Sequence, residues 1–213
     1  MQFKSINEQV YEYVMRQIRY GKYNGGDKVS ESTLAEAFNI SRTPIREALS
    51  SLVDDGVLVF QKNKGFYVKE INHEELVKKH EIIAQLDAFA AKLALPNLKE
   101  EHFVEMENYI IRMDLAIDQK SYEFYDDTQE AFHNVYFNVC SNEYVIPIIK
   151  DLQKSIIRMT VRSDDENALF KRLREYNEEH RQILQAFKDG DKDRVSALLL
   201  VHGYSPDTTN VFY

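Results

Sequence analysis

Hydrophobic positions in the first seventy residues follow a helical period and then a strand period. Apolar residues recur every three or four positions over 7–20, which predicts a helix. The same spacing at Leu34, Ala35 and Phe38 predicts a second helix, and at Ile45, Ala48, Leu49 and Leu52 a third. After Gly56 the period shortens to two. The segments 57–61 and 66–71 flank Lys62-Asn63-Lys64-Gly65, which predicts a hairpin, and 27–30 is long enough only for a short strand. Helix, strand, helix, turn, helix and hairpin is the order of a winged helix-turn-helix.

The apolar pattern from residue 73 onward is helical throughout. It predicts about six helices, over 73–95, 98–118, 121–140, 144–163, 166–189 and 191–203. Five of the seven glycines precede residue 71, as turns between short mixed elements require. We therefore predict a mainly α protein. An N-terminal winged helix-turn-helix domain with an α/β wing (1–71) is followed by an all-α antiparallel helical bundle (72–213).

Charge is distributed unevenly between these two parts. The formal net charge is −8, but residues 1–71 hold 10 Lys and Arg against 9 Asp and Glu, whereas residues 72–213 hold 17 against 26. An acidic C-terminal part does not exclude a basic face near the N-terminus. No apolar run reaches the roughly 18 residues of a membrane span, and the first residues lack a secretory signal. We expect a cytoplasmic protein with no membrane partner.

The start of the third predicted helix, "SRTPIR" at 41–46, carries two arginines that packing alone does not require. Ser41 or Thr43 can cap the helix, and Pro44 falls in the first turn, where its missing N–H is harmless. A recognition helix enters the major groove N-terminal end first, so Arg42, Thr43 and Arg46 would meet DNA. An arginine there can pair with guanine or with phosphate.

Three lysines could add to this face. Lys62 and Lys64 flank the hairpin tip and could reach the DNA backbone or the minor groove, and Lys28 in the short strand could contact phosphate. The alternative is a small α+β interaction domain whose arginine pair is simply solvated.

A longer segment carries a family resemblance. "SESTLAEAFNISRTPIREALSSLVDDGVLVFQKNKGFYV" closely resembles the winged-helix DNA-binding domain of the GntR superfamily of bacterial transcription regulators, over about residues 6–71. The resemblance implies a DNA-contacting role for Arg42, Thr43, Arg46, Lys64 and Gly65. Gly65 would act through its backbone, since a residue without Cβ lets the wing tip come close.

Histidines are the chemical signal of the helical part. His133, His180 and His202 fall in separate predicted helices, and Gln129 lies one turn before His133 on the same face. Facing helices of a bundle can direct such side chains to one interior point, where a metal or a ligand could bind. Isolated surface or packing histidines are the alternative.

Residues 72–213 resemble the FCD effector-binding domain, the helical partner domain of the FadR-like branch, and six helices suggest its VanR-like subgroup. The motifs are "FH" at 132–133, "EHRQILQAFKDGD" at 179–191 and His202 at the end of "RVSALLLVH". The resemblance implies a divalent metal, Zn²⁺ or Ni²⁺, held by an aspartate and three histidines. Gln129 stands where that aspartate is expected, which weakens metal binding. Asp126 could compensate, or it belongs with Asp127 to a solvated or capping pair.

The residues that would bind the effector carboxylate differ from the family pattern. Members of that family often have an arginine in the first helix of the domain that meets an effector carboxylate, and Ile83 occupies that position here. Arg158 and Arg162 could supply the missing charge, or they are ordinary solvated cations. A small organic acid is expected as effector, but not an ordinary dicarboxylate or sugar acid, because the usual counter-charge is missing at Ile83.

Together these features predict an effector-responsive transcription regulator that binds an inverted-repeat operator on double-stranded DNA as a homodimer, with repression relieved by ligand. Two alternatives are a direct metal sensor and a constitutive DNA-binding regulator with a degenerate pocket. A third is a metal-dependent enzyme fused to a DNA-binding module. Its general base would be Glu130, Glu178 or Glu179, but a signature such as HExxH is missing.

Overall fold

The computed structural model describes residues 4–70, 72–156 and 166–203. These residues divide into two compact units, the first mainly 4–76 and the second mainly from 77 onward, which we describe separately. The predicted boundary between 71 and 72 stays a prediction.

Three helices of the first unit form where the sequence pattern predicts them: α1 (Ile6–Arg19), α2 (Glu31–Phe38) and α3 (Arg42–Asp54). Ser5 begins α1 with a capping box, in which its side chain accepts from the Glu8 N–H while the Glu8 carboxylate accepts from the Ser5 N–H. Ser30 caps α2 by accepting from the Thr33 N–H. Both α1 and α2 pack against α3.

A small antiparallel sheet completes the first unit. Its strands β1 (Lys28–Val29), β2 (Leu58–Gln61) and β3 (Gly65–Val68) are ordered β1-β3-β2, and Phe60 pairs with Phe66 while Gln61 pairs with Gly65. Both hairpin strands are shorter than predicted. Val57 instead donates its N–H to the Leu52 carbonyl at the end of α3, and Ile71 lies outside the described residues. Gly65 has φ +102°, a conformation in which any L side chain is strained.

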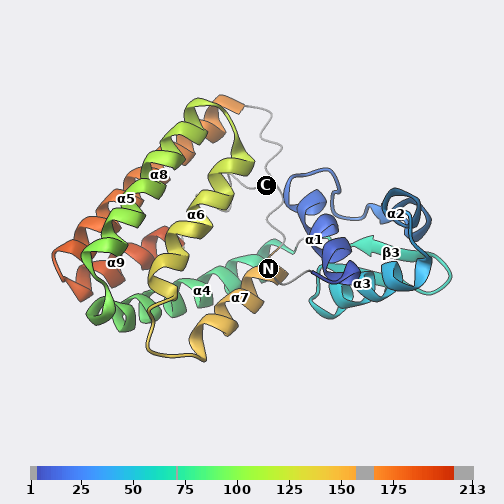
Figure 1. Cartoon of the computed structure of the whole chain (residues 1–213), viewed down its shortest axis with the longest axis horizontal. Helices are drawn as coiled ribbons and strands as arrows, with labels where there is room; N and C mark the ends of the chain where they lie inside the picture. Colours follow the sequence, from blue (N-terminus) through green and yellow to red (C-terminus); the bar gives the residue numbers. More distant parts are fainter. Residues whose placement is uncertain (1–3, 71, 157–165, 204–213) are drawn as a thin grey trace. The chain divides into compact units, whose positions relative to one another are not determined.

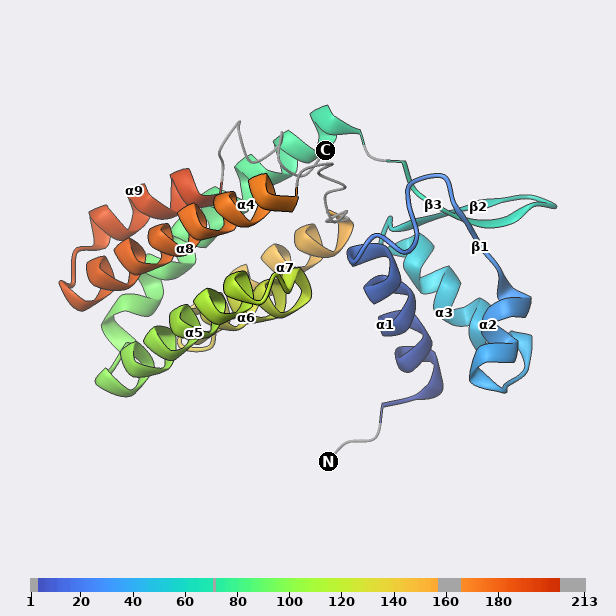
Figure 2. The ribbon, with the colours of Figure 1, turned by 90° about the horizontal axis from the view of Figure 1, so that it is seen from above.

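The six predicted helices are present, most of them within the second unit and with somewhat different ends. They are α4 (His73–Ala94), α5 (Glu100–Asp118), α6 (Tyr122–Phe137), α7 (Val145–Ser155), α8 (Glu166–Lys188) and α9 (Lys192–Gly203), with a short 3₁₀ turn, η1 (Leu95–Asn97), around Pro96. Residues 157–163 of the helix predicted over 144–163 lie outside the described residues. α5 packs against α6 and α8, and α8 packs against α9, so α8 lies between two neighbours (Figure 1, Figure 2). The mainly α fold with a small β wing is confirmed.

Large side chains fill the interior of the bundle. Phe132 and Tyr136 of α6, Phe187 of α8 and Met113 of α5 are all fully buried. Burying such residues is the main force that holds the helices together. This packing fixes the faces of α6, α8 and α9, which carry the three histidines. None of the described helices combines the length and the apolarity that a membrane crossing requires.

Candidate nucleic-acid interface and metal centre

The exposed face of α3 is set by its buried face. Ile45, Ala48, Leu49 and Leu52 are buried in the core of the first unit, which also contains Val14 and Ile18 of α1. Arg42, Thr43 and Arg46 therefore lie on the opposite, solvent-exposed side. Ser41 occupies the N-cap position, but its side chain makes no capping hydrogen bond.

Most of the predicted DNA contacts line one groove. The groove has a volume of about 500 Å³ and is formed by β1, the start of α2, the start of α3 and the hairpin. Five cations face one carboxylate there, that of Glu31, so the groove attracts anions. Its predicted members are Lys28, Arg42, Arg46, Lys62, Lys64 and Gly65. Thr43 is exposed one residue away and does not line the groove.

Among the groove residues that were not predicted contacts, Glu31 and Phe60 lie beside Arg46. The Glu31 carboxylate lies with Oε1 3.6 Å from Nε of Arg46. Phe60 is 47% exposed, and its ring centroid is 5.9 Å from the guanidinium carbon of Arg46. Hydrophobic alternation in the hairpin did not reveal Phe60, because β2 is an edge strand on which three successive residues are exposed.

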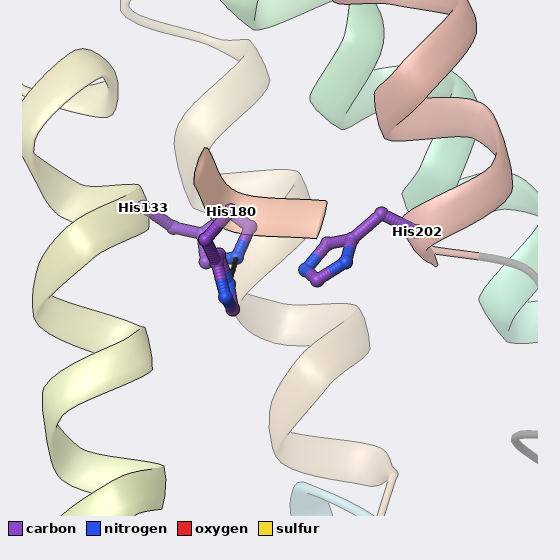
Figure 3. A group of neighbouring side chains, drawn as sticks. All are labelled: His133, His180 and His202. Atoms are coloured by element: carbon purple, nitrogen blue, oxygen red, sulfur yellow. Dashed lines mark hydrogen bonds between the residues drawn. The ribbon is translucent and has the colours of Figure 1, made fainter. Parts of the chain in front are cut away.

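In the second unit, three histidines from three helices meet. His133 of α6, His180 of α8 and His202 of α9 each offer a ligand atom within 4.8 Å of the others, and the Nε2 atoms of His133 and His180 are 3.4 Å apart (Figure 3). His180 is fully buried, and its ring also packs edge-on against Phe132. The bundle thus brings together residues that lie up to 69 positions apart in the chain.

A hydrogen-bonded group of Asp87 and Tyr136 determines which ring nitrogen of His133 donates toward it. The Tyr136 hydroxyl donates to Oδ1 of Asp87 at 2.5 Å, and it lies 2.6 Å from Nδ1 of His133. Burial and the neighbouring Asp87 raise the pKa of Tyr136 well above its ordinary value, so the hydroxyl stays protonated. Its single proton is given to Asp87, so it must accept from Nδ1–H of His133. Nδ1 also lies 3.5 Å from Oδ2 of Asp87, a second acceptor, so when the His133 ring is neutral its Nε2 atom carries the lone pair.

Hydrogen bonding orients His202, and burial acts on His180. Nδ1 of His202 lies 2.7 Å from Oε2 of Glu179, and because a carboxylate accepts, Nδ1 carries a proton and Nε2 is the atom available for a metal. Burial lowers the pKa of His180 well below its ordinary value, and His202 and His133 lower it further. A neutral imidazole is the form that binds metals.

This donor set fits a divalent cation. Three nitrogens bound to Zn²⁺ at about 2.0–2.1 Å in tetrahedral geometry lie roughly 3.3 Å apart, close to the separation of the His133 and His180 atoms. Carboxylates that accept from the remote nitrogens of ligating histidines are a common arrangement around such ions. Here the Asp87 carboxylate is linked to Nδ1 of His133 through the Tyr136 hydroxyl, and the Glu179 carboxylate accepts from Nδ1 of His202.

Gln129 and Asp126 lie one turn apart on α6 and are hydrogen-bonded to each other. Gln129 of α6 donates from Nε2 to Oδ1 of Asp126 at 3.0 Å. Asp126 is 0% exposed, so the interpretation of Asp126 as one of a solvated pair is wrong, because it lies on the inner face of α6. Its carboxylate is also not part of the three-histidine group. Arg158 and Arg162, the candidate effector contacts, lie outside the described residues.

Comparison with known proteins agrees with both halves of this description. Residues 6–68 match the family described as "Bacterial regulatory proteins, gntR family", and residues 80–204 match the FCD domain. The chain belongs to the GntR family of bacterial regulators and carries an FCD domain. The VanR-like subgroup stays a prediction.

Curated relatives of this GntR-family regulator act in transcription. It is 23% identical over 197 residues to the HTH-type transcriptional repressor RspR of Escherichia coli, covering 92% of this chain and 85% of the relative. It is 26% identical over 186 residues to the Nta operon transcriptional regulator of Aminobacter aminovorans, covering 84% and 82%. The family is one of transcriptional regulators and not of enzymes. Glu179, one of the candidate bases, is paired with His202.

A solved structure supports the fold of the whole chain. E. coli McbR/YncC superposes with a TM-score of 0.85 at 22% identity, covering 99% of this chain and 98% of that one. At this identity the likeness concerns the fold, a winged helix-turn-helix followed by a helical domain.

Proposed function

We propose that this regulator binds an inverted-repeat operator as a homodimer, represses transcription there, and releases the DNA when a small organic acid binds in the helical bundle. The observation that carries the DNA-binding part is the cationic groove, in which residues from four separate elements converge beside the exposed face of α3. Two recognition helices about 34 Å apart would read half-sites in successive major grooves.

Roles within the groove follow from the chemistry of each side chain. Arg42 and Arg46 on α3 can each give a bidentate contact to guanine O6 and N7. Lys62 and Lys64 at the hairpin and Lys28 on β1 are compact charges suited to phosphate. Thr43, in the first turn of α3, can donate to phosphate or touch a thymine methyl. Gly65 lets the wing turn tightly, which its positive φ supports.

Effector binding is assigned to the three-histidine cluster. His133, His180 and His202 would hold Zn²⁺ or Ni²⁺, with the amide oxygen of Gln129 as a neutral fourth donor. When bound, the ion supplies a positive charge that attracts the carboxylate of an organic acid. Asp87 and Glu179 would orient His133 and His202 for this task. A contribution from Arg158 or Arg162 to the effector site belongs to the same proposal.

Release of DNA requires that the effector bind unequally to two states. An acid in the bundle can change operator affinity only if it favours an arrangement of the two winged domains that fits the half-sites less well. The bundle is therefore assigned both the dimer contact and the effector site. A direct metal sensor is the second candidate, and the neutral Gln129 favours it because it leaves a metal more weakly held.

The proposal is tested with full-length protein and sheared genomic DNA from the organism that encodes it. Fragments retained by the protein are sequenced, and a duplex carrying the enriched sequence, the selected fragment, is titrated by fluorescence anisotropy. ZnCl₂, NiCl₂ and a set of small organic acids are then added separately and together. Release by acid, strengthened by metal, supports the proposal, and release by metal alone supports the sensor. Sedimentation showing a monomer on the selected fragment, or no release by any addition, contradicts the proposal.

A further inference from the structure

We propose that Phe60 of the wing positions Arg46 for base contact and thereby helps to set the sequence specificity of the groove. This inference rests on the DNA-binding function proposed above. It concerns a residue that carries no charge and no hydrogen-bonding group, and that nevertheless lies in the cationic groove.

Phe60 is held at the groove by a second aromatic ring. It pairs with Phe66 across the hairpin, and the two ring centroids are 5.0 Å apart with their planes inclined by 54°. Phe66 belongs to the buried core of the first unit, whereas Phe60 is 47% exposed. The buried ring therefore supports an exposed one. Its exposed part can therefore offer a ring face to a cation in the groove.

Arg46 lies between groups from two other elements. On one side its guanidinium carbon is 5.9 Å from the Phe60 ring centroid, within the range of a cation–π contact. On another side its Nε is 3.6 Å from Oε1 of Glu31, in the first turn of α2. The base of the side chain is fixed by α3. Three elements of the winged domain thus restrict where this arginine points before DNA arrives.

Such restriction matters because of how arginine reads guanine. Bidentate pairing uses two N–H groups of the planar fork in one orientation, and a long flexible side chain loses rotamer freedom when it adopts that orientation. Glu31 approaches Nε, so the terminal nitrogens are the ones offered to the base edge. The cation–π contact with the Phe60 ring restricts the orientation of the Arg46 guanidinium plane. Phosphate contacts, which tolerate many orientations, would benefit less.

The test uses full-length protein with the Phe60→Leu and Phe60→Tyr substitutions. Leu keeps an apolar side chain against Phe66 but removes the ring, whereas Tyr keeps the ring. Phe60→Leu is expected to weaken binding to the selected fragment by roughly two- to fivefold, as loss of a surface cation–π contact implies. Binding to a shuffled duplex of the same composition should change little. Phe60→Tyr should stay near the parent on both duplexes, and Val59→Ala, at an exposed neighbour that does not line the groove, serves as control.

A double-mutant cycle separates positioning from direct contact. If Phe60 acts through Arg46, Phe60→Leu has no further effect on the selected fragment in an Arg46→Ala background. The inference is overturned if the loss is equal in both backgrounds, which would mean that Phe60 itself touches DNA, or if the preference for the selected fragment is unchanged. Equal thermal midpoints of all variants establish that the winged domain remains folded. If the parent protein prefers no fragment at all, the proposed function itself falls.

Discussion

The hydroxyl of Tyr136 offers a sharp test of the histidine cluster. Tyr136→Phe removes a single oxygen from a fully buried side chain and leaves its ring, which packs against Phe187, in place. That oxygen makes hydrogen bonds of 2.5 Å to Asp87 and 2.6 Å to His133. Without it, Nδ1–H of His133 keeps only the longer approach of 3.5 Å to Oδ2 of Asp87, so the tautomer in which Nε2 is protonated becomes more accessible.

The expected magnitude follows from these two bonds. Removing a group that orients a ligating histidine typically lowers metal affinity by about 10- to 100-fold, which corresponds to about 1.4–2.8 kcal/mol. Removing the hydroxyl that donates to Oδ1 of the buried Asp87 carboxylate should also lower the free energy of unfolding by about 1–3 kcal/mol. Both effects come from one atom, so they should appear together in Tyr136→Phe.

Tyr125→Phe is a matched control on the same helix. Tyr125 is also buried in α6, and among the described residues its hydroxyl has no hydrogen-bond partner. Affinity for Zn²⁺ is measured by competition with a chromophoric chelator, and stability by thermal unfolding without metal. Tyr125→Phe should leave metal affinity unchanged and stability equal or higher. Equal metal affinity of the Tyr136→Phe protein and the parent would refute the claim that the Tyr136 hydroxyl orients His133 for metal binding.

Three further substitutions test other parts of the account. Gln129→Asp should tighten Zn²⁺ binding, on the order of tenfold, because a carboxylate replaces a neutral amide; unchanged affinity in the chelator assay would place Gln129 outside the site. Lys64→Ala should weaken binding to the selected and shuffled duplexes alike and lower the slope of log affinity against log salt by roughly 1. A change confined to the selected fragment would instead make Lys64 a base reader. Leu52→Ala, at a fully buried position of α3, should lower the free energy of unfolding by about 2–5 kcal/mol in denaturant titrations. A loss below 1 kcal/mol would mean that the core beneath α3 is not packed as described.

Sequence periodicity predicted the helices because their boundaries are encoded locally. Ser5 and Ser30 supply caps, and the change of period after Gly56 separates the hairpin from α3. Where ends were misplaced, the cause lies in short-range hydrogen bonding. α6 ends at Phe137: the Asn138 amide still bonds four residues back, to Asn134, but the amides of Val139 and Cys140 bond to carbonyls three residues back. The apolar pattern continues through this tighter turn and so cannot reveal it.

Some residues of the candidate sites could be predicted from their sequence neighbours, whereas others depend on how distant helices pack together. The convergence of the three histidines could be predicted once they were assigned to facing helices. Tyr136 lies three residues after His133 and was in principle visible as a neighbour on the same face. Asp87, 49 residues earlier, depends on how α4 packs beside α6, which no local pattern specifies. Asp126 was misjudged for the same reason, since a carboxylate looks solvated until the packed face of its helix is known.

The most direct measurement compares the parent protein with the Arg42→Ala, Arg46→Ala double variant on the selected and shuffled duplexes at one salt concentration. Specific regulators of this kind bind their sites about 1,000-fold or more tighter than other DNA. The parent should show such a ratio, and the double variant should lose it while keeping weak, salt-sensitive binding to both duplexes and an unchanged thermal midpoint. A double variant that still prefers the selected fragment by the parental ratio would contradict the claim that the start of α3 reads the operator.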